Sequence, residues 1–140
     1  MWPSLGLGPS DHAYVVWTQN LDMGGGCAGI DPGPRDGTYF ATDATGQWVT
    51  TRLTRTPGES AITFEPSTGR IDVITHDFDG GGPLTYRTSS DGTDWTAAPI
   101  SDTRELTDPV IRVDPATNRL VVLAISWSDE MPGIVLLTLS

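Results

Sequence analysis

The sequence predicts an all-β fold built from short antiparallel strands. Turn-forming residues are frequent, with 16 glycines and 11 prolines among 140 residues, and they interrupt nearly every stretch long enough for a helix. No window of about ten residues keeps the apolar periodicity of a helix. A pattern of two short strands joined by a proline turn also recurs along the chain. Together these features favour many short strands in one domain.

The recurring pattern has the form of a hairpin and occurs three times. The segments are PSLGLGPSDHAYVVWTQ from Pro3, SAITFEPSTGRIDVITHD from Ser60 and PVIRVDPATNRLVVLAIS from Pro109. Each contains a short strand, a turn led by proline and a second apolar strand. Proline presets the first dihedral angle of such a turn, and Asp, Gly or Asn tolerates the positive φ that follows. We therefore expect three hairpins with similar turns.

Two further strands are expected after each hairpin. GTYFATDATGQWVTTRLT aligns with PLTYRTSSDGTDWTAAPIS, which places Tyr39 on Tyr86 and Trp48 on Trp95. In the third copy GIVLLTLS takes the same place, with Leu136 on the tyrosines. The predicted unit thus has four strands and a period of roughly 50 residues. Its copies are expected at about residues 1–57, 58–107 and 108–140, the last without its outer strand.

The second strands of these hairpins predict how the units pack. Residues 121–125 form an almost continuous apolar run, and so do residues 15–17. A strand that is apolar on both faces must be covered on both sides. Blades stacked face to face around an axis provide this cover, so we predict three antiparallel blades of a partial β-propeller. A two-sheet sandwich also uses many short strands, but it would not explain the recurrence.

Charge and composition exclude several partners. The net charge is −10 with a pI near 4.2, so the phosphates of nucleic acids and anionic membrane surfaces would repel the chain. No apolar run is long enough to span a bilayer, and no segment reads as a signal peptide. Cys27 is the single cysteine, which excludes an internal disulfide and a cysteine metal site.

One turn resembles a known family motif. Ser89, Asp91, Gly92 and Trp95 look like a box of the form Ser-x-Asp-x-Gly-x-Thr-Trp, shortened by one residue. The chain therefore resembles BNR or Asp-box propellers, a group that includes sialidase-type propellers. The resemblance implies that the Asp carboxylate accepts backbone N–H groups within the turn, that Gly supplies an unusual dihedral angle and that Trp packs between blades.

The resemblance has two further implications. The box lies on the face opposite the binding site in such folds, so Asp91 is not expected to be catalytic. An extracellular or periplasmic location is expected for the parent protein. In the first unit Asp43 and Trp48 keep the spacing of the box, although Ala41 replaces Ser and Thr45 stands where Gly is expected.

Long irregular loops between the second and third strands of each unit are the expected place for a ligand. They lie on one face together with the connections between units. Polar and aromatic residues gather there, and we name as ligand-binding candidates Asp36, His76, Asp77, Arg104 and Trp127. A glycan or a protein is the expected ligand.

Three alternatives stay open. A sialidase-like glycoside hydrolase would need two carboxylates across a sugar, for which Asp77, Asp129 and Glu130 are weak candidates. Calcium would find oxygen ligands at Asp77 and Asp79, although their spacing matches no known calcium loop. The segment could also be a scaffold without chemistry of its own. Three blades do not close a ring, so missing blades are expected from upstream sequence or from a second copy of the chain.

Overall fold

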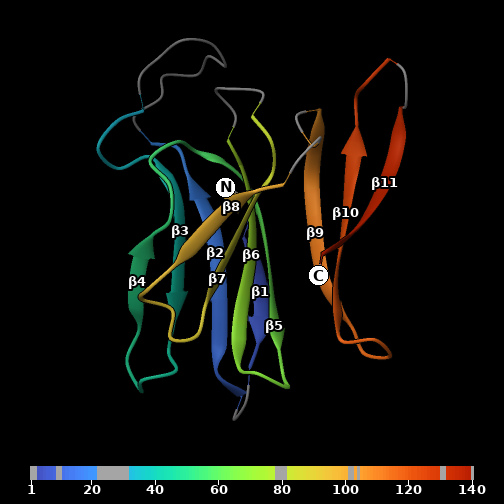
Figure 1. Ribbon diagram of the computed structural model, residues 1–140. Coiled ribbons are helices and arrows are strands. Elements are labelled where there is room, and N and C mark those ends of the chain that lie inside the picture. Colours follow the sequence, from blue (N-terminus) through green and yellow to red (C-terminus); the bar gives the residue numbers. More distant parts are fainter. Residues whose placement is uncertain are drawn as a thin grey trace.

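The computed structural model describes residues 3–8, 11–21, 32–77, 82–100, 103, 105–129 and 132–139. In these residues eleven strands form three antiparallel sheets (Figure 1), and there is no α-helix. The described part of the chain accordingly holds no helix that could cross a membrane. The all-β prediction is confirmed, and each sheet remains open rather than closing on itself.

Each sheet is a meander in which consecutive strands are neighbours. The first sheet contains β1 (Ser4–Leu7), β2 (Ala13–Gln19), β3 (Gly37–Thr42) and β4 (Val49–Arg52). The second contains β5 (Gly58–Glu65), β6 (Arg70–Asp77), β7 (Thr85–Ser89) and β8 (Thr96–Pro99). The third contains β9 (Leu106–Asp114), β10 (Arg119–Ser126) and β11 (Gly133–Leu139).

The proline-led turns adopt the predicted chemistry. Asp11, Gly69 and Asn118 have φ angles of 60°, 76° and 55° in the turns β1–β2, β5–β6 and β9–β10. The amide of Gly69 donates to the carbonyl of Glu65 at 2.9 Å, and Asn118 donates to Asp114 at 2.8 Å. These residue types tolerate the left-handed region, so the turns form at the predicted positions.

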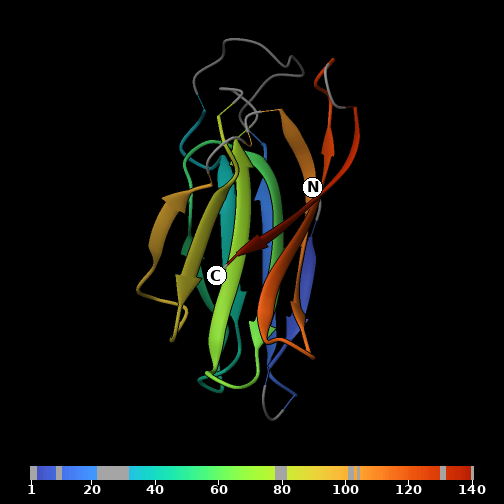
Figure 2. The ribbon, with the colours of Figure 1, turned by 45° about the vertical axis from the view of Figure 1, so that its right-hand side comes forward.

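The three sheets pack face to face in sequence order. Strand β5 contacts β1 and β2 of the first sheet, and it contacts β9 of the third on its other side. Figure 2 shows the long strands of the three sheets running side by side. Two apolar clusters fill the two gaps. Val16, Phe40, Ile62 and Val73 belong to the first, between the first and second sheets.

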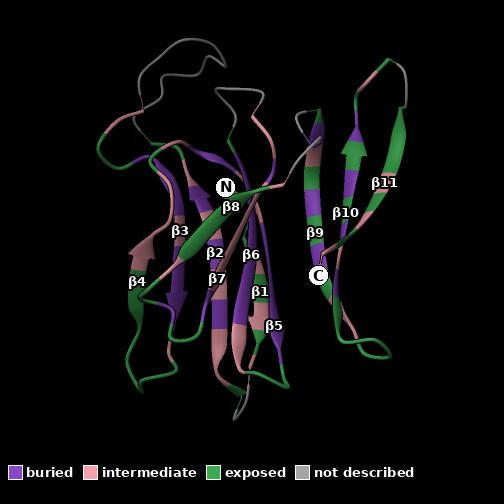
Figure 3. Cartoon of the chain, viewed as in Figure 1, coloured by how far each residue is buried: buried purple, intermediate pink, exposed green. Residues whose placement is uncertain are grey.

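The second cluster joins the second and third sheets. It contains Ile74 and Leu84 from one side and Ile111, Leu120 and Val122 from the other. The second sheet is therefore buried on both faces, which its purple strands β5 and β6 display in Figure 3. Burial of two opposite faces explains why β6 carries apolar residues without strict alternation.

The turn β7–β8 has the geometry expected from the box motif. Oδ1 of Asp91 accepts the backbone N–H groups of Thr93 and Asp94 at 2.8 and 2.9 Å. Gly92 has a φ of 78°. The ring of Trp95 packs edge-on against Phe40 of the first sheet, with centroids 5.0 Å apart. Because Asp91 closes its own turn, its charge is held in place by the backbone.

One predicted alignment is wrong by a residue. Val16 pairs with Phe40, whereas Ile74, at the equivalent position of β6, pairs with Tyr86. Phe40 and not Tyr39 is therefore the structural counterpart of Tyr86. The connection from Thr42 to β4 is one residue shorter than the connection from Thr88 to β8, and aligning the tryptophans moved the tyrosines out of register.

Candidate functional site

Strand direction sorts the connections into two ends of the molecule. The loops β2–β3, β6–β7 and β10–β11 and the connections β4–β5 and β8–β9 lie at one end, which we call the loop end (top of Figure 1). The tight turns lie at the other, the turn end. Of the candidate residues, the loop end holds Asp36, His76, Asp77, Trp127 and Asp129 among the described residues. Outside the described residues lie Asp79, Arg104 and Glu130.

Asp36 is fully buried and closes the β2–β3 loop. Its Oδ1 accepts the backbone N–H of Leu21 at 2.6 Å, and its Oδ2 accepts that of Gly33 at 3.0 Å. Its carbonyl oxygen accepts a hydrogen bond from the guanidinium of Arg52. These bonds give Asp36 a structural task in shaping the loop.

His76 lies buried between the second and third sheets. Its Nδ1 is 3.7 Å from Oε2 of Glu59, beyond hydrogen-bond length, and both ring nitrogens lack a hydrogen-bond partner within the described residues. Oε2 of Glu59 accepts the backbone N–H of Asp108 at 2.5 Å. Burial alone would raise the pKa of Glu59, but His76 and the Asp108 N–H outweigh it and the pKa is lowered. Glu59 thus joins β5 to β9 as an anion.

Asp77 ends β6 with an exposed side chain, and the sequence analysis missed its cationic neighbour. Arg87 on β7 donates from Nε to Oγ1 of Thr75 at 3.2 Å, which directs the guanidinium toward the loop end. Burial lowers the pKa of Arg87, and the charge of Asp77 opposes this shift. Arg87 lies within a strand, and the length of its side chain is the signal that it can reach the end of that strand.

Trp127 follows β10 and is the most exposed aromatic side chain described at the loop end, at 71% of its full surface. Its Nε1 donates to Oγ1 of Thr107 on β9 at 2.8 Å, and its backbone N–H donates to the carbonyl of Glu105 at 3.1 Å. The indole is therefore tied to β9 through Nε1, and the backbone of Trp127 is held by the Glu105 carbonyl, while most of the residue's surface faces solvent. Trp17 on β2, by comparison, stacks on Tyr39 of the neighbouring strand β3, with ring centroids 5.6 Å apart.

The described candidates for metal ligation and acid catalysis belong to the ends of different strands. Among them, no three His, Cys, Asp or Glu side chains gather closely enough to hold a metal ion. Asp77 ends a strand of the second sheet, whereas the exposed Asp129 follows a strand of the third. The calcium candidate Asp79 and the acid candidate Glu130 lie outside the described residues.

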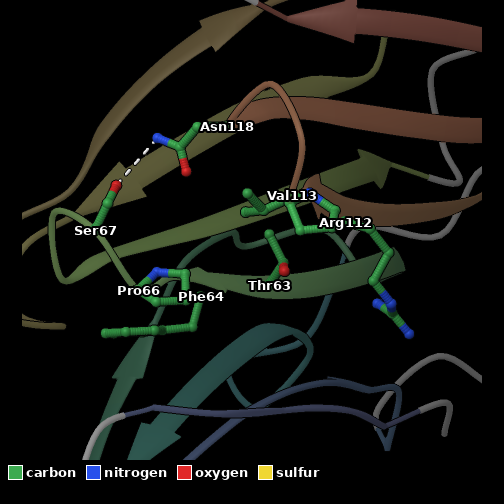
Figure 4. Close-up of a pocket in the computed structure, with 8 residues that line it drawn as sticks. Thr63, Phe64, Pro66, Ser67, Arg112, Val113 and Asn118 are labelled. Carbon is green, nitrogen blue, oxygen red and sulfur yellow. Dashed lines mark hydrogen bonds between the residues drawn. The ribbon is translucent and has the colours of Figure 1, made fainter.

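A groove of about 550 Å³ lies at the turn end, away from the predicted residues (Figure 4). It runs between the turns β5–β6 and β9–β10. Its lining residues are Thr63, Phe64, Pro66, Ser67, Arg112, Val113, Pro115 and Asn118. Nδ2 of Asn118 donates to Oγ of Ser67 at 3.0 Å and to Oε1 of Glu65 at 2.5 Å. These hydrogen bonds link the second sheet to the third.

The fold and these residues define an all-β protein with three stacked antiparallel sheets and an anchored, exposed indole at the loop end. No protein-family model and no curated protein matches the sequence. Among solved structures, the chain is similar to a fucose lectin from Kordia zhangzhouensis, determined in complex with methyl-fucoside, with a TM-score of 0.56. The identity is 10%, and the match covers 99% of this chain and 98% of the lectin chain. At this identity the likeness concerns the fold.

Proposed function

We propose that this protein binds carbohydrate and that Trp127 forms part of its site. The proposal is supported by the similarity of the whole fold to a fucose lectin and by the exposed indole at the loop end. The apolar C–H face of a sugar packs well on an aromatic ring, while polar groups nearby select its hydroxyls.

The anchoring of Trp127 is the observation that carries the proposal. An indole that bonds to Thr107, on a backbone held by the Glu105 carbonyl, loses little conformational entropy when a sugar stacks on it. His76 and Asp77, with Arg104 outside the described residues, stay as proposed ligand contacts at this end, and Asp36 would act on the site by shaping the β2–β3 loop.

The sheets themselves we propose to be blades of a β-propeller related to the Asp-box group. Three successive meanders, with β1, β5 and β9 adjacent at the sheet interfaces, support this arrangement. The geometry of Asp91, Gly92 and Trp95 in the turn β7–β8 supports the relation. An extracellular or periplasmic location is the place where such a lectin would meet glycans. No observation favours the sialidase-like alternative.

Direct binding measurements test the function. We expect saturable binding of at least one glycan on an array, with methyl-fucoside as the first monosaccharide for isothermal titration calorimetry. Trp127→Ala should lower the affinity by about fivefold, because stacking on one aromatic ring contributes on the order of 1 kcal/mol. Trp127→Phe should retain part of the affinity, since it keeps an aromatic face.

The matched control is Trp48→Ala. Trp48 is also exposed, at 61%, but it lies in the turn β3–β4 at the opposite end. Its substitution should leave the affinity per chain unchanged. Equal losses in both variants, or retention of full affinity in Trp127→Ala, would place the site elsewhere. Hydrolysis of a sialoside that is abolished by Asp77→Ala would favour the enzyme instead.

A further inference from the structure

The third sheet has an apolar face with no neighbour among the described residues. We call it the trailing face, because it points away from the preceding sheet. Its exposed side chains are Val110, Leu123, Ile125, Ile134 and Leu136, which come from all three strands and are aligned across β9, β10 and β11 by the strand register. A contiguous aliphatic surface of this kind on a sheet marks a contact site.

Equivalent positions in the other two sheets are buried by the sheet that follows. Ser4, Ala61 and Val110 each stand five residues before the turn proline of their hairpin. Their partners on the second strands are Val16, Ile74 and Leu123, which are therefore equivalent positions. Val16 and Ile74 are completely buried, whereas Leu123 is 43% exposed. The same position therefore carries an aliphatic residue in each sheet, and within the described ranges the third sheet lacks the neighbour that would cover it.

The first sheet also has an uncovered apolar face. We call it the leading face, because it points away from the second sheet. Leu5 stands four residues before the turn proline, as do Ile62 and Ile111 in the other sheets. Ile62 and Ile111 are buried against the preceding sheet, whereas Leu5 is 59% exposed. Leu7, the next residue on the same face, is also exposed.

One tryptophan contact within the chain indicates which residues of the two exposed faces would meet. Trp95 of the second sheet packs on Phe40 in the trailing face of the first. The counterpart of Trp95 is Trp48, one residue before β4, as Trp95 is one residue before β8. The counterpart of Phe40 is Leu136, because Phe40 pairs with Val16 as Leu136 pairs with Leu123. Both Trp48 and Leu136 are more than 60% exposed.

We propose that a second copy of this chain supplies the missing neighbours, head to tail. The trailing face of one copy covers the leading face of the other, and Leu136 of one copy contacts Trp48 of its partner. This contact repeats the one that Phe40 and Trp95 make within the chain. The proposed interface also continues the face-to-face stacking that already joins the first sheet to the second and the second to the third.

The number of sheets sets the number of copies. Closed rings of stacked sheets typically contain about four to eight of them. With three sheets in each chain, six is the multiple that falls in this range, which corresponds to two copies related by a twofold axis. The net charge of −10 on each chain opposes association, and the burial of apolar surface must overcome it.

The mass in solution tests the association. Size-exclusion chromatography with light scattering should give twice the chain mass for the unsubstituted chain, and added salt should strengthen the association by screening the like charges. Leu136→Asp and Leu5→Asp should each reduce the mass to that of one chain, because both faces are needed. Leu21→Asp, an equally exposed leucine outside the two faces, should leave the dimer intact. Circular dichroism should show an unchanged strand content in all three variants.

Cross-linking tests the geometry. In a Cys27→Ser background, mixing Trp48→Cys with Leu136→Cys should give a disulfide-linked dimer under oxidation, and neither variant alone should. Cross-linking of Leu136→Cys with itself would show like faces in contact and would overturn the head-to-tail arrangement. A chain that stays monomeric at all concentrations would overturn the proposal. This holds for either remaining occupant of the faces, another protein or further sheets of a longer polypeptide.

Discussion

The hydroxyl of Tyr86 donates a 2.5 Å hydrogen bond to Oδ1 of Asp72, a carboxylate that is fully buried between the second and third sheets. Nε of Arg70 donates to the same oxygen at 2.7 Å, and its NH2 group lies 3.1 Å from Oε2 of Glu65. The buried charge of Asp72 is thus balanced by one cation and one neutral donor. The hydrogen bond between Tyr86 and Asp72 links β7 to β6.

Burial and the bond to Asp72 raise the pKa of Tyr86 to about 12. The neutral phenol is favoured in the folded state, so its stabilising contribution is present below the unfolded pKa of about 10 and is lost as the pH rises toward 12. An ultraviolet titration of tyrosinate should show one of the three tyrosines ionising near pH 12. Tyr86→Phe should remove that transition and also flatten the loss of stability above pH 10.

The side chain of Arg52 should contribute strongly to the stability of the loop end. Its guanidinium donates to four backbone carbonyls, those of Pro34, Asp36, Thr54 and Arg55. Arg52→Ala should lower the free energy of unfolding by about 2 kcal/mol, because acceptors are left without their charged donor. Arg55→Ala is the control, since it removes an exposed guanidinium and keeps the carbonyl. Equal denaturation midpoints for the two variants would contradict this role.

The turns β3–β4 and β7–β8 provide a matched pair of glycines. Gly46 and Gly92 have φ angles of 82° and 78°, so alanine is strained at both by about 1 kcal/mol. A Cβ on Gly46 would meet nothing within 4 Å, whereas one on Gly92 would lie 2.7 Å from Cε1 of Phe40. Gly92→Ala should therefore destabilise the protein by about 1–3 kcal/mol more than Gly46→Ala in urea denaturation. Equal effects would mean that the turn β7–β8 does not press on the first sheet.

Asp91 should keep its negative charge in acid. The backbone N–H groups of Asp94 and Thr93 lower its pKa to about 2. Its contribution to stability is present above the unfolded pKa of about 4 and is lost as the pH falls through 2. Asp91→Ala should lower the melting temperature at pH 7, and the difference from the unsubstituted protein should shrink at pH 2. Asp94→Ala is the control in the same turn, since Asp94 supplies only its backbone.

The local chemistry of this fold could be predicted from the sequence. Asp11, Gly69 and Asn118 occupy the positive-φ positions of three turns that the proline pattern predicted. The strand content of each sheet follows from the same recurrence. These features depend on a few neighbouring residues, so a short segment contains the information that determines them.

Features that depend on contacts between sheets could not be predicted. The one-residue slip between Tyr39 and Phe40 follows from a turn length that alignment of the tryptophans concealed. Trp95 packs on a preceding sheet and Trp48 does not, although their local sequences are similar. At the site, the sequence named Trp127, but its tether to Thr107 joins residues 20 apart in the chain and required coordinates.

The most direct test of carbohydrate binding at Trp127 is a nuclear magnetic resonance titration of the indole N–H groups with methyl-fucoside. The chain has five tryptophans, and each gives its own indole cross-peak. We predict that the cross-peak of Trp127, assigned by its absence in Trp127→Phe, shifts with a saturable dependence on the sugar while that of Trp48 stays in place. Saturating sugar that moves none of the five cross-peaks, or that moves Trp48 and leaves Trp127 unchanged, would contradict this site.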